Sequence, residues 1–223
     1  MISISRRLRQ SLLIVATLGL ANCASLDSQR ERTPDPNQRL DQLLAIYHEA
    51  RQNGSNCQEG LDADTGVIDC SRVQREVDRL YAEFPKQERI IMANAVMQYE
   101  AGRRENSQFL LDQLLSMPGP HPEAAILRSR IAMEEGNSSR AKVLLREQIN
   151  LAPDYAELHE AMASALYLEG KYIEAIDALK VAELLAAPAW RIAYHRGVIH
   201  EALSNPQLAC NEYQFSLNQM PRY

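Results

Sequence analysis

The chain has 223 residues, of which 24 are basic and 29 are acidic, so its formal net charge at pH 7 is −5. An acidic chain argues against nucleic-acid binding, which uses a basic face, and against adsorption to anionic lipid by charge alone. Hydrophobic residues make up 46% of the chain, an ordinary share for a soluble globular protein.

Residues 1–22 are typical of an export signal rather than of folded structure. Arg6, Arg7 and Arg9 form a basic head, and residues 11–20 form a short apolar core. This core is about half as long as a transmembrane helix must be, so we do not expect a permanent membrane span. Removal of residues 1–22 takes away three arginines and no acidic residue, which changes the net charge from −5 to −8.

The stretch Leu20-Ala21-Asn22-Cys23 resembles a bacterial lipobox, although Asn22 stands where such signals usually carry Gly, Ala or Ser. The resemblance implies that Cys23 is lipidated and becomes the new N-terminus, on the periplasmic side of a Gram-negative envelope. Ala24 follows Cys23 in place of the Asp that commonly retains lipoproteins in the inner membrane, which favours the outer membrane. A plain secretory peptide with an incidental cysteine is the alternative.

A flexible tether and a degenerate helix pair are predicted to follow. Residues 23–36 are polar and carry two prolines, as linkers often do. In residues 37–87, Asn37–Gln52 has an apolar face and predicts a helix. Residues 53–69 interrupt the pattern with three glycines, and Ser71 is a typical N-cap for a second helix that ends at Phe84. We interpret the two helices as one repeat with an enlarged internal turn.

The four cysteines have different predicted fates. Cys23 is assigned to the lipid. Cys57 and Cys70 bracket the enlarged turn, and an oxidising periplasm favours a disulfide between them. Closing so short a loop would stabilise the fold by about 3 kcal/mol. Cys210 is expected to be a partly buried, inert thiol, because it adjoins the core residue Ala209.

The enlarged turn is also acidic. Asp62, Asp64 and Asp69 alternate around Gly66 in a manner similar to a calcium loop, in which carboxylates converge on one hard cation. The glycine comes one place early and no Glu closes the ring, so a solvated acidic turn is the preferred interpretation and no metal site is predicted. A ligand-binding, calcium-binding or enzymatic lipoprotein that uses residues 53–70 is the competing functional class.

From Glu88 onward, the same residue types return every 34 positions. Glycine occurs at 102, 136 and 170, and Ser204 takes the next step. Alanine keeps the same interval at 141, 175 and 209. Apolar residues at helical spacing precede and follow each glycine, so each unit predicts two helices joined by a tight turn.

This period resembles the tetratricopeptide repeat (TPR). The resemblance implies an all-α fold, an α-solenoid of helix hairpins with four repeats in residues 88–223, at 88–121, 122–155, 156–189 and 190–223. Two features depart from the family pattern. The early aromatic position holds no aromatic residue in any repeat, and the usual leucine position holds Asn94, Arg128 and Arg196. Chance recurrence of Gly, Ala and Pro is the alternative.

In the TPR family, the first helix of each repeat usually lines a concave wall. On the register above, the partner-binding groove predicted for this chain consists of Arg89, Met92, Val96, Tyr99, Ile126, Arg130, Met133, Glu160, Tyr167, Arg191 and Tyr194. Methionines and tyrosines among charges of both signs suit a partner peptide or helix. An ordinary solvated face is the alternative. The Asn–Lys clamp with which some relatives bind a peptide carboxylate is missing, so that ligand is not expected.

The patterns together predict a lipid-anchored periplasmic scaffold for other envelope proteins, similar to pilotin lipoproteins or to adaptors of murein enzymes. The sequence contains no P-loop, nucleophile elbow or dinucleotide fingerprint, and His159-Glu160 lacks the second His of a zinc-protease helix. No catalytic residue and no cofactor is therefore predicted. The last helix, with Leu208, Phe215 and Leu217, is predicted to dock a partner or a second copy of the chain.

Overall fold

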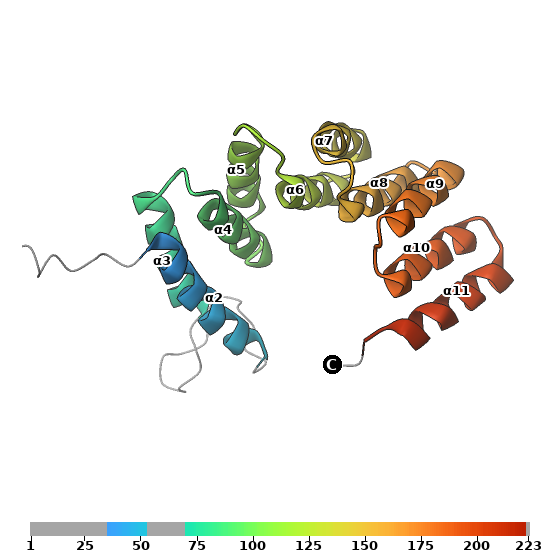
Figure 1. Cartoon of the computed structure of the whole chain (residues 1–223), viewed down its shortest axis with the longest axis horizontal. Coiled ribbons are helices and arrows are strands. Elements are labelled where there is room, and N and C mark those ends of the chain that lie inside the picture. Colours follow the sequence, from blue (N-terminus) through green and yellow to red (C-terminus); the bar gives the residue numbers. More distant parts are fainter. Residues whose placement is uncertain (1–34, 53–69, 222–223) are drawn as a thin grey trace, which may run out of the picture. The chain divides into compact units, whose positions relative to one another are not determined.

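The computed structural model describes residues 35–52 and 70–221 (Figure 1). The chain divides into two units, 1–39 and 40–223. The described part of the first unit is residues 35–39, which hold the start of helix α2 (Pro36–Gln52). The predicted lipidation site Cys23, the predicted disulfide partner Cys57 and the acidic turn at 62–69 lie outside the described residues.

In the described residues all regular secondary structure is helical, which agrees with the predicted all-α class. The helices are α2 (Pro36–Gln52), α3 (Cys70–Glu83), α4 (Glu88–Glu100), α5 (Arg104–Leu115), α6 (Pro122–Glu134), α7 (Ser138–Leu151), α8 (Ala156–Leu168), α9 (Tyr172–Leu184), α10 (Ala189–Ala202) and α11 (Pro206–Gln219). The first helices α4, α6 and α8 begin at the first residues of the predicted repeats, and α10 begins one residue early.

The helices pack as consecutive hairpins. Helix α4 packs on α5, α6 on α7, α8 on α9 and α10 on α11 (Figure 1). The second helix of each hairpin also contacts the first helix of the next, and α6 contacts α8 directly. Each hairpin therefore buries its apolar surface against its neighbours in sequence, as repeat proteins do.

The turns inside the hairpins explain the glycine period. Gly102, Gly136 and Gly170 have φ of +76°, +76° and +73°, in the left-handed region where a Cβ is costly. The following residue closes each helix with a hydrogen bond to a carbonyl five residues back, for example Asn137 N to Ala132 O at 2.8 Å. This is the Schellman ending, in which glycine is favoured. Ser204 adopts the same conformation at φ +60° without being glycine.

Small residues lie where the two helices of a hairpin meet. The pairs Ala95 with Ser107, Ser129 with Ala141, Ala163 with Ala175 and Gly197 with Ala209 are all buried. The Ser107 hydroxyl donates to the carbonyl of Ala95 at 2.8 Å, which satisfies the one polar group at its contact. A Cβ on Gly197 would lie 2.5 Å from a ring carbon of Tyr213, so only glycine fits opposite that ring.

Two of the three polar residues at the leucine position are buried. Asn94 is buried and accepts hydrogen bonds from Gln74 at 3.1 Å and Gln98 at 3.3 Å. Arg128 is buried and donates from Nε to Asp112 at 2.9 Å. These side chains connect neighbouring helices by hydrogen bonds where the family pattern would use a leucine.

The structure corrects several predicted details. A proline at 188 is expected from its missing amide to stop the second helix of its repeat, but α9 already ends at Leu184 and Ala186 adopts φ +65°. Pro188 instead precedes α10 as its N-cap, with φ −56°. Ser71 is not an N-cap, because α3 already begins at Cys70. Cys210 is exposed rather than partly buried, since one residue of helix turns it about 100° away from the inward-facing Ala209.

The start of α2 differs by one residue from the prediction. The helix begins at Pro36, which the sequence had placed in the tether. Asp35 precedes it, and the Asp35 carboxylate accepts a hydrogen bond from the Asn37 backbone at 3.2 Å. An acidic cap followed by proline in the first helical position is a favoured helix start, which accounts for the difference.

Candidate partner-binding groove

The first helices of successive repeats line three connected hollows, which we call the groove. The α2–α4 hollow has a volume of about 460 Å³ and is lined by one side of α2, including Leu44 and Tyr47, by one side of α4, including Met92 and Val96, and by Glu123. The α4–α8 hollow, of about 390 Å³, is lined by α4, α6 and α8 and by Tyr155 just before α8. The α6–α10 hollow, of about 300 Å³, is lined by α6, α8 and α10. Each hollow is of a size that proteins use for ligand side chains.

Eight of the eleven residues predicted for the groove line these hollows: Arg89, Met92, Val96, Tyr99, Ile126, Arg130, Met133 and Tyr167. They lie on one side of α4, α6 and α8 because the prediction followed positions three or four residues apart. Whether they contact a partner stays a prediction.

The other three predicted groove residues have different surroundings. Glu160 is buried, and Arg191 is engaged in an ion pair with it, so neither side chain lines the hollows. Tyr194 is exposed and lies against Tyr213, with ring centroids 6.0 Å apart. These side chains link α10 to α8 and to α11, and whether the three residues contact a partner stays a prediction.

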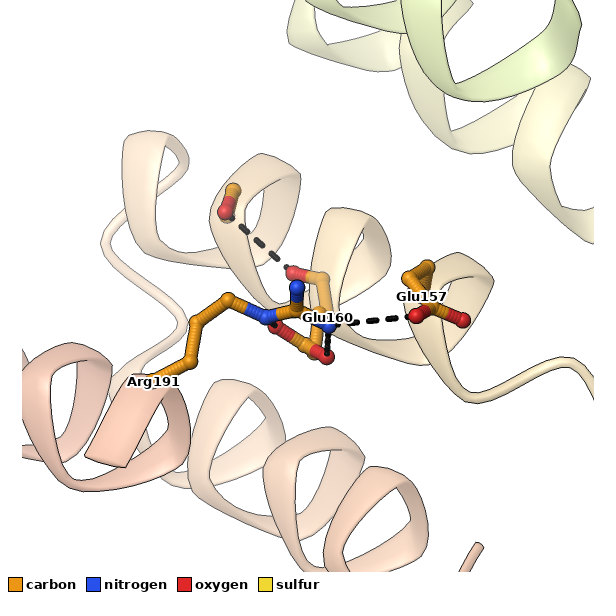
Figure 2. A network of polar contacts seen from close by, with 4 residues as sticks. Glu157, Glu160 and Arg191 are labelled. Carbon is orange, nitrogen blue, oxygen red and sulfur yellow. Dashed lines mark hydrogen bonds and ion pairs between the residues drawn. The ribbon is translucent and has the colours of Figure 1, made fainter. Parts of the chain in front are cut away.

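An ion pair joins Arg191 on α10 to the buried carboxylate of Glu160 on α8 (Figure 2). Nε and Nη2 of Arg191 each donate to a carboxylate oxygen of Glu160 at 2.6 Å, and Nη2 also donates to Glu157 at 3.2 Å. The hydrogen bonds to Glu160 raise the pKa of Arg191 above its usual value. Because both oxygens of Glu160 are bonded, the buried carboxylate is satisfied, and the pair links repeat three to repeat four.

Tyrosine–glutamate contacts tie the other first helices together. The Tyr47 hydroxyl on α2 and Arg51 both donate to Glu100 on α4, and the Tyr99 hydroxyl on α4 donates to Glu134 on α6. Burial and the neighbouring carboxylate raise the pKa of both tyrosines, so the phenols stay protonated and remain donors. The groove wall is thus held together by side chains at its rim.

Several residues that line the α6–α10 hollow were not predicted from the sequence, among them Glu134, Ala163, Leu168, His195 and Ile199. They lie one position away from the residues chosen by a spacing of three or four, or at the end of a helix. That spacing therefore gave no signal for them. Burial lowers the pKa of His195 below its ordinary value, which favours the neutral imidazole, so His195 adds no charge to this hollow at neutral pH.

In the ranges 35–52 and 70–221, no cluster of three or more His, Cys, Asp or Glu side chains could hold a metal ion. None of the described helices has the length and apolar character needed to cross a bilayer. Cys70 is buried among Tyr47, Val73 and Val77, and its predicted bond to Cys57 stays a prediction.

Comparisons with known proteins bear on the fold alone. No family model and no curated protein matches the sequence. Among solved structures, the thermophilic TPR protein TTC0263 of Thermus thermophilus is 16% identical, with a TM-score of 0.66 over 84% of this chain and 93% of that one.

Two structures of MamA are similar as well. One is 13% identical with a TM-score of 0.56, over 77% of this chain and 92% of that one. The other, from Desulfovibrio magneticus RS-1, is 12% identical with a TM-score of 0.56, over 80% and 95%. At these identities the likeness shows the fold, and it confirms the predicted all-α TPR solenoid.

Proposed function

We propose that this chain is a lipid-anchored periplasmic scaffold that binds other envelope proteins in the groove. The observation that carries the proposal is the row of three open hollows on the first helices of a TPR fold. Their lining combines methionine, tyrosine and branched aliphatic side chains with charges of both signs, which suits a protein segment better than a small polar metabolite. No catalytic role is part of the proposal.

A crosslinking experiment tests the groove. A photoreactive residue replaces Met133, which lines the α6–α10 hollow, or Val143, which is exposed on α7 outside the groove. In cells that naturally produce the chain, we expect the probe at 133 to capture a protein that the probe at 143 does not. Adding Arg130→Glu and Tyr167→Ala should abolish that capture. Undiminished capture in this variant would show that the groove is assigned wrongly.

The anchor is proposed from Cys23 and the residues before it, and it has its own test. A thioether-linked diacylglycerol and an N-acyl chain together suffice for stable membrane attachment. We expect Cys23→Ser to move the chain from the membrane fraction to the soluble periplasm, and mass spectrometry of the wild-type N-terminal peptide to find acyl chains. Membrane retention of Cys23→Ser would rule out this anchor without affecting the groove.

A further inference from the structure

The charged side chains that line the groove are not equivalent. Most of these lining residues are neutralised within the chain: Arg89 pairs with Asp41, Arg51 and Glu100 pair with each other, and the lining residues Glu134 and Glu157 pair with Arg104 and Arg191, which lie outside the hollows. Two lining residues, Glu123 and Arg130, form no ion pair with any residue that the structure describes. Each has a tyrosine hydroxyl as its polar neighbour, Tyr155 for Glu123 and Tyr99 for Arg130, and a neutral hydroxyl does not cancel the charge.

Both unneutralised charges lie on one face of α6. Glu123 is in the first turn, beside the hydroxyl of Tyr155, and Arg130 lies two turns further along, beside the hydroxyl of Tyr99. Two residues seven positions apart on an α-helix lie on nearly the same side of it and about 10.5 Å apart along its axis. Both side chains line the α4–α8 hollow, with Ile126 between them and Met92 and Val96 opposite on α4.

We infer that the groove binds an amphipathic helix of the partner, with one basic and one acidic residue seven positions apart and an apolar side chain between them. This inference rests on the proposed function and specifies its partner. The basic residue would face Glu123, the apolar one would contact Ile126 and Met92, and the acidic one would face Arg130.

The spacing favours a helix over an extended strand. Side chains on one face of a strand are separated by multiples of about 6.7 Å, and neither one nor two such steps match the separation of about 10.5 Å between the two charges on α6. Helix residues at i and i+7 match this separation and share a face, and the residue at i+3 or i+4 lies between them. Beyond Arg130, the α6–α10 hollow offers Met133, Tyr167 and Val198 to the next apolar residue of such a helix.

The test uses four synthetic helical peptides of equal length with leucines on one face. Three carry Lys and Glu, two Lys, or two Glu at positions seven apart, and the fourth carries Lys and Glu five apart, on different sides of the helix. Fluorescence anisotropy with the full chain at low salt should give the tightest binding for Lys and Glu seven apart. Each mismatched charge should weaken binding about two- to fivefold, the range for an exposed ion pair.

Charge-reversal variants give a result that does not depend on the direction in which the peptide lies. Glu123→Lys should prefer the peptide with two Glu, and Arg130→Glu should prefer the peptide with two Lys. Raising the salt to about 0.5 M should reduce all these preferences, because exposed charges are then screened within a few ångströms. Glu105→Lys on α5 and Arg146→Glu on α7 change the same charges at exposed positions outside the groove and should leave the preferences unchanged.

Three outcomes would overturn the inference. Equal affinity of the wild type for all four peptides, lost in Met92→Asp, would keep the groove as a binding surface and remove the charge requirement. Tighter binding of a proline-rich peptide with charges three apart would replace the helix by an extended partner. Failure of every peptide to bind, with crosslinking at Met133 intact, would reject this partner while keeping the proposed function; loss of both would reject the two together.

Discussion

Ser204 is the residue at which the repeat pattern and the backbone conflict. Its φ of +60° is the conformation that glycine supplies in the other three hairpins, and a Cβ is unfavourable there. We predict that Ser204→Gly raises the free energy of unfolding by about 0.5–1 kcal/mol, measured by urea denaturation. Gly136→Ala, at φ +76°, should lower it by a similar amount. A destabilised Ser204→Gly would show that the serine side chain contributes more than the strain costs.

His195 predicts a pH dependence of stability. Burial lowers the pKa of its imidazole below the ordinary value of 6.5, with Glu160 opposing the shift and Arg191 adding to it. Between the folded and unfolded pKa the unfolded chain binds more protons, so the free energy of unfolding rises with pH in that window. The contribution of neutral His195 is thus complete above the ordinary pKa and is lost as the pH falls through the lower, folded pKa.

The measurement is urea denaturation at several pH values between about 5 and 7, the range that brackets an ordinary histidine. His195→Phe should weaken the pH dependence relative to the wild type, because the group that gains a proton on unfolding is gone. His48→Gln, at an exposed position on α2, is the matched control and should leave the slope unchanged. Equal slopes in all three proteins would assign the pH dependence to other groups.

Between elements, the contact of α10 with α11 depends on the absence of a Cβ at position 197. Three ring carbons of Tyr213 lie 2.5, 2.7 and 3.1 Å from where that Cβ would be, and the Tyr213 hydroxyl donates to Glu201 at 2.8 Å, which holds the ring in place. Gly197→Ala should therefore destabilise the protein by about 1–3 kcal/mol through overpacking, visible as a lower urea midpoint. Tyr213→Leu should absorb most of this cost in the double variant, whereas strictly additive effects would contradict the clash.

The junction of α8 with α10 depends on the ion pair of Arg191 with Glu160. Arg191→Ala leaves a carboxylate that is buried without a cation, which costs about 3–5 kcal/mol in other proteins. Replacing both residues by methionine removes the buried charge, so we predict that Glu160→Met/Arg191→Met is more stable than Arg191→Ala in urea denaturation. If the double variant is the less stable of the two, the pair contributes net stability rather than only avoiding a penalty.

Across the whole molecule, the sequence predicts the turns that require a glycine. It does not predict a left-handed turn at another residue type, or burial that depends on a partner in the next repeat. Gly102, Gly136 and Gly170 mark the turns because a left-handed residue is required there. The end of α9 was missed because Ala186 adopts φ +65° without any residue-type signal. The burial of Glu160 was missed for a different reason: its partner Arg191 is 31 residues away, in the next repeat.

The stacking of hairpins predicts a gradient of local stability along the chain. Helices α6 and α8 pack against neighbours on both sides, whereas α11 packs extensively against α10 alone among the described helices. In a repeat array each unit is stabilised by its neighbours, so α11 should open most easily. Hydrogen–deuterium exchange should therefore be faster in residues 206–219 than in residues 156–168. Leu217 and Met220, which are exposed on and just after α11, offer an apolar surface that a second copy could protect. If α11 exchanges as slowly as α8 in dilute protein, the gradient is wrong; if its protection rises with protein concentration, that supports the predicted association through α11.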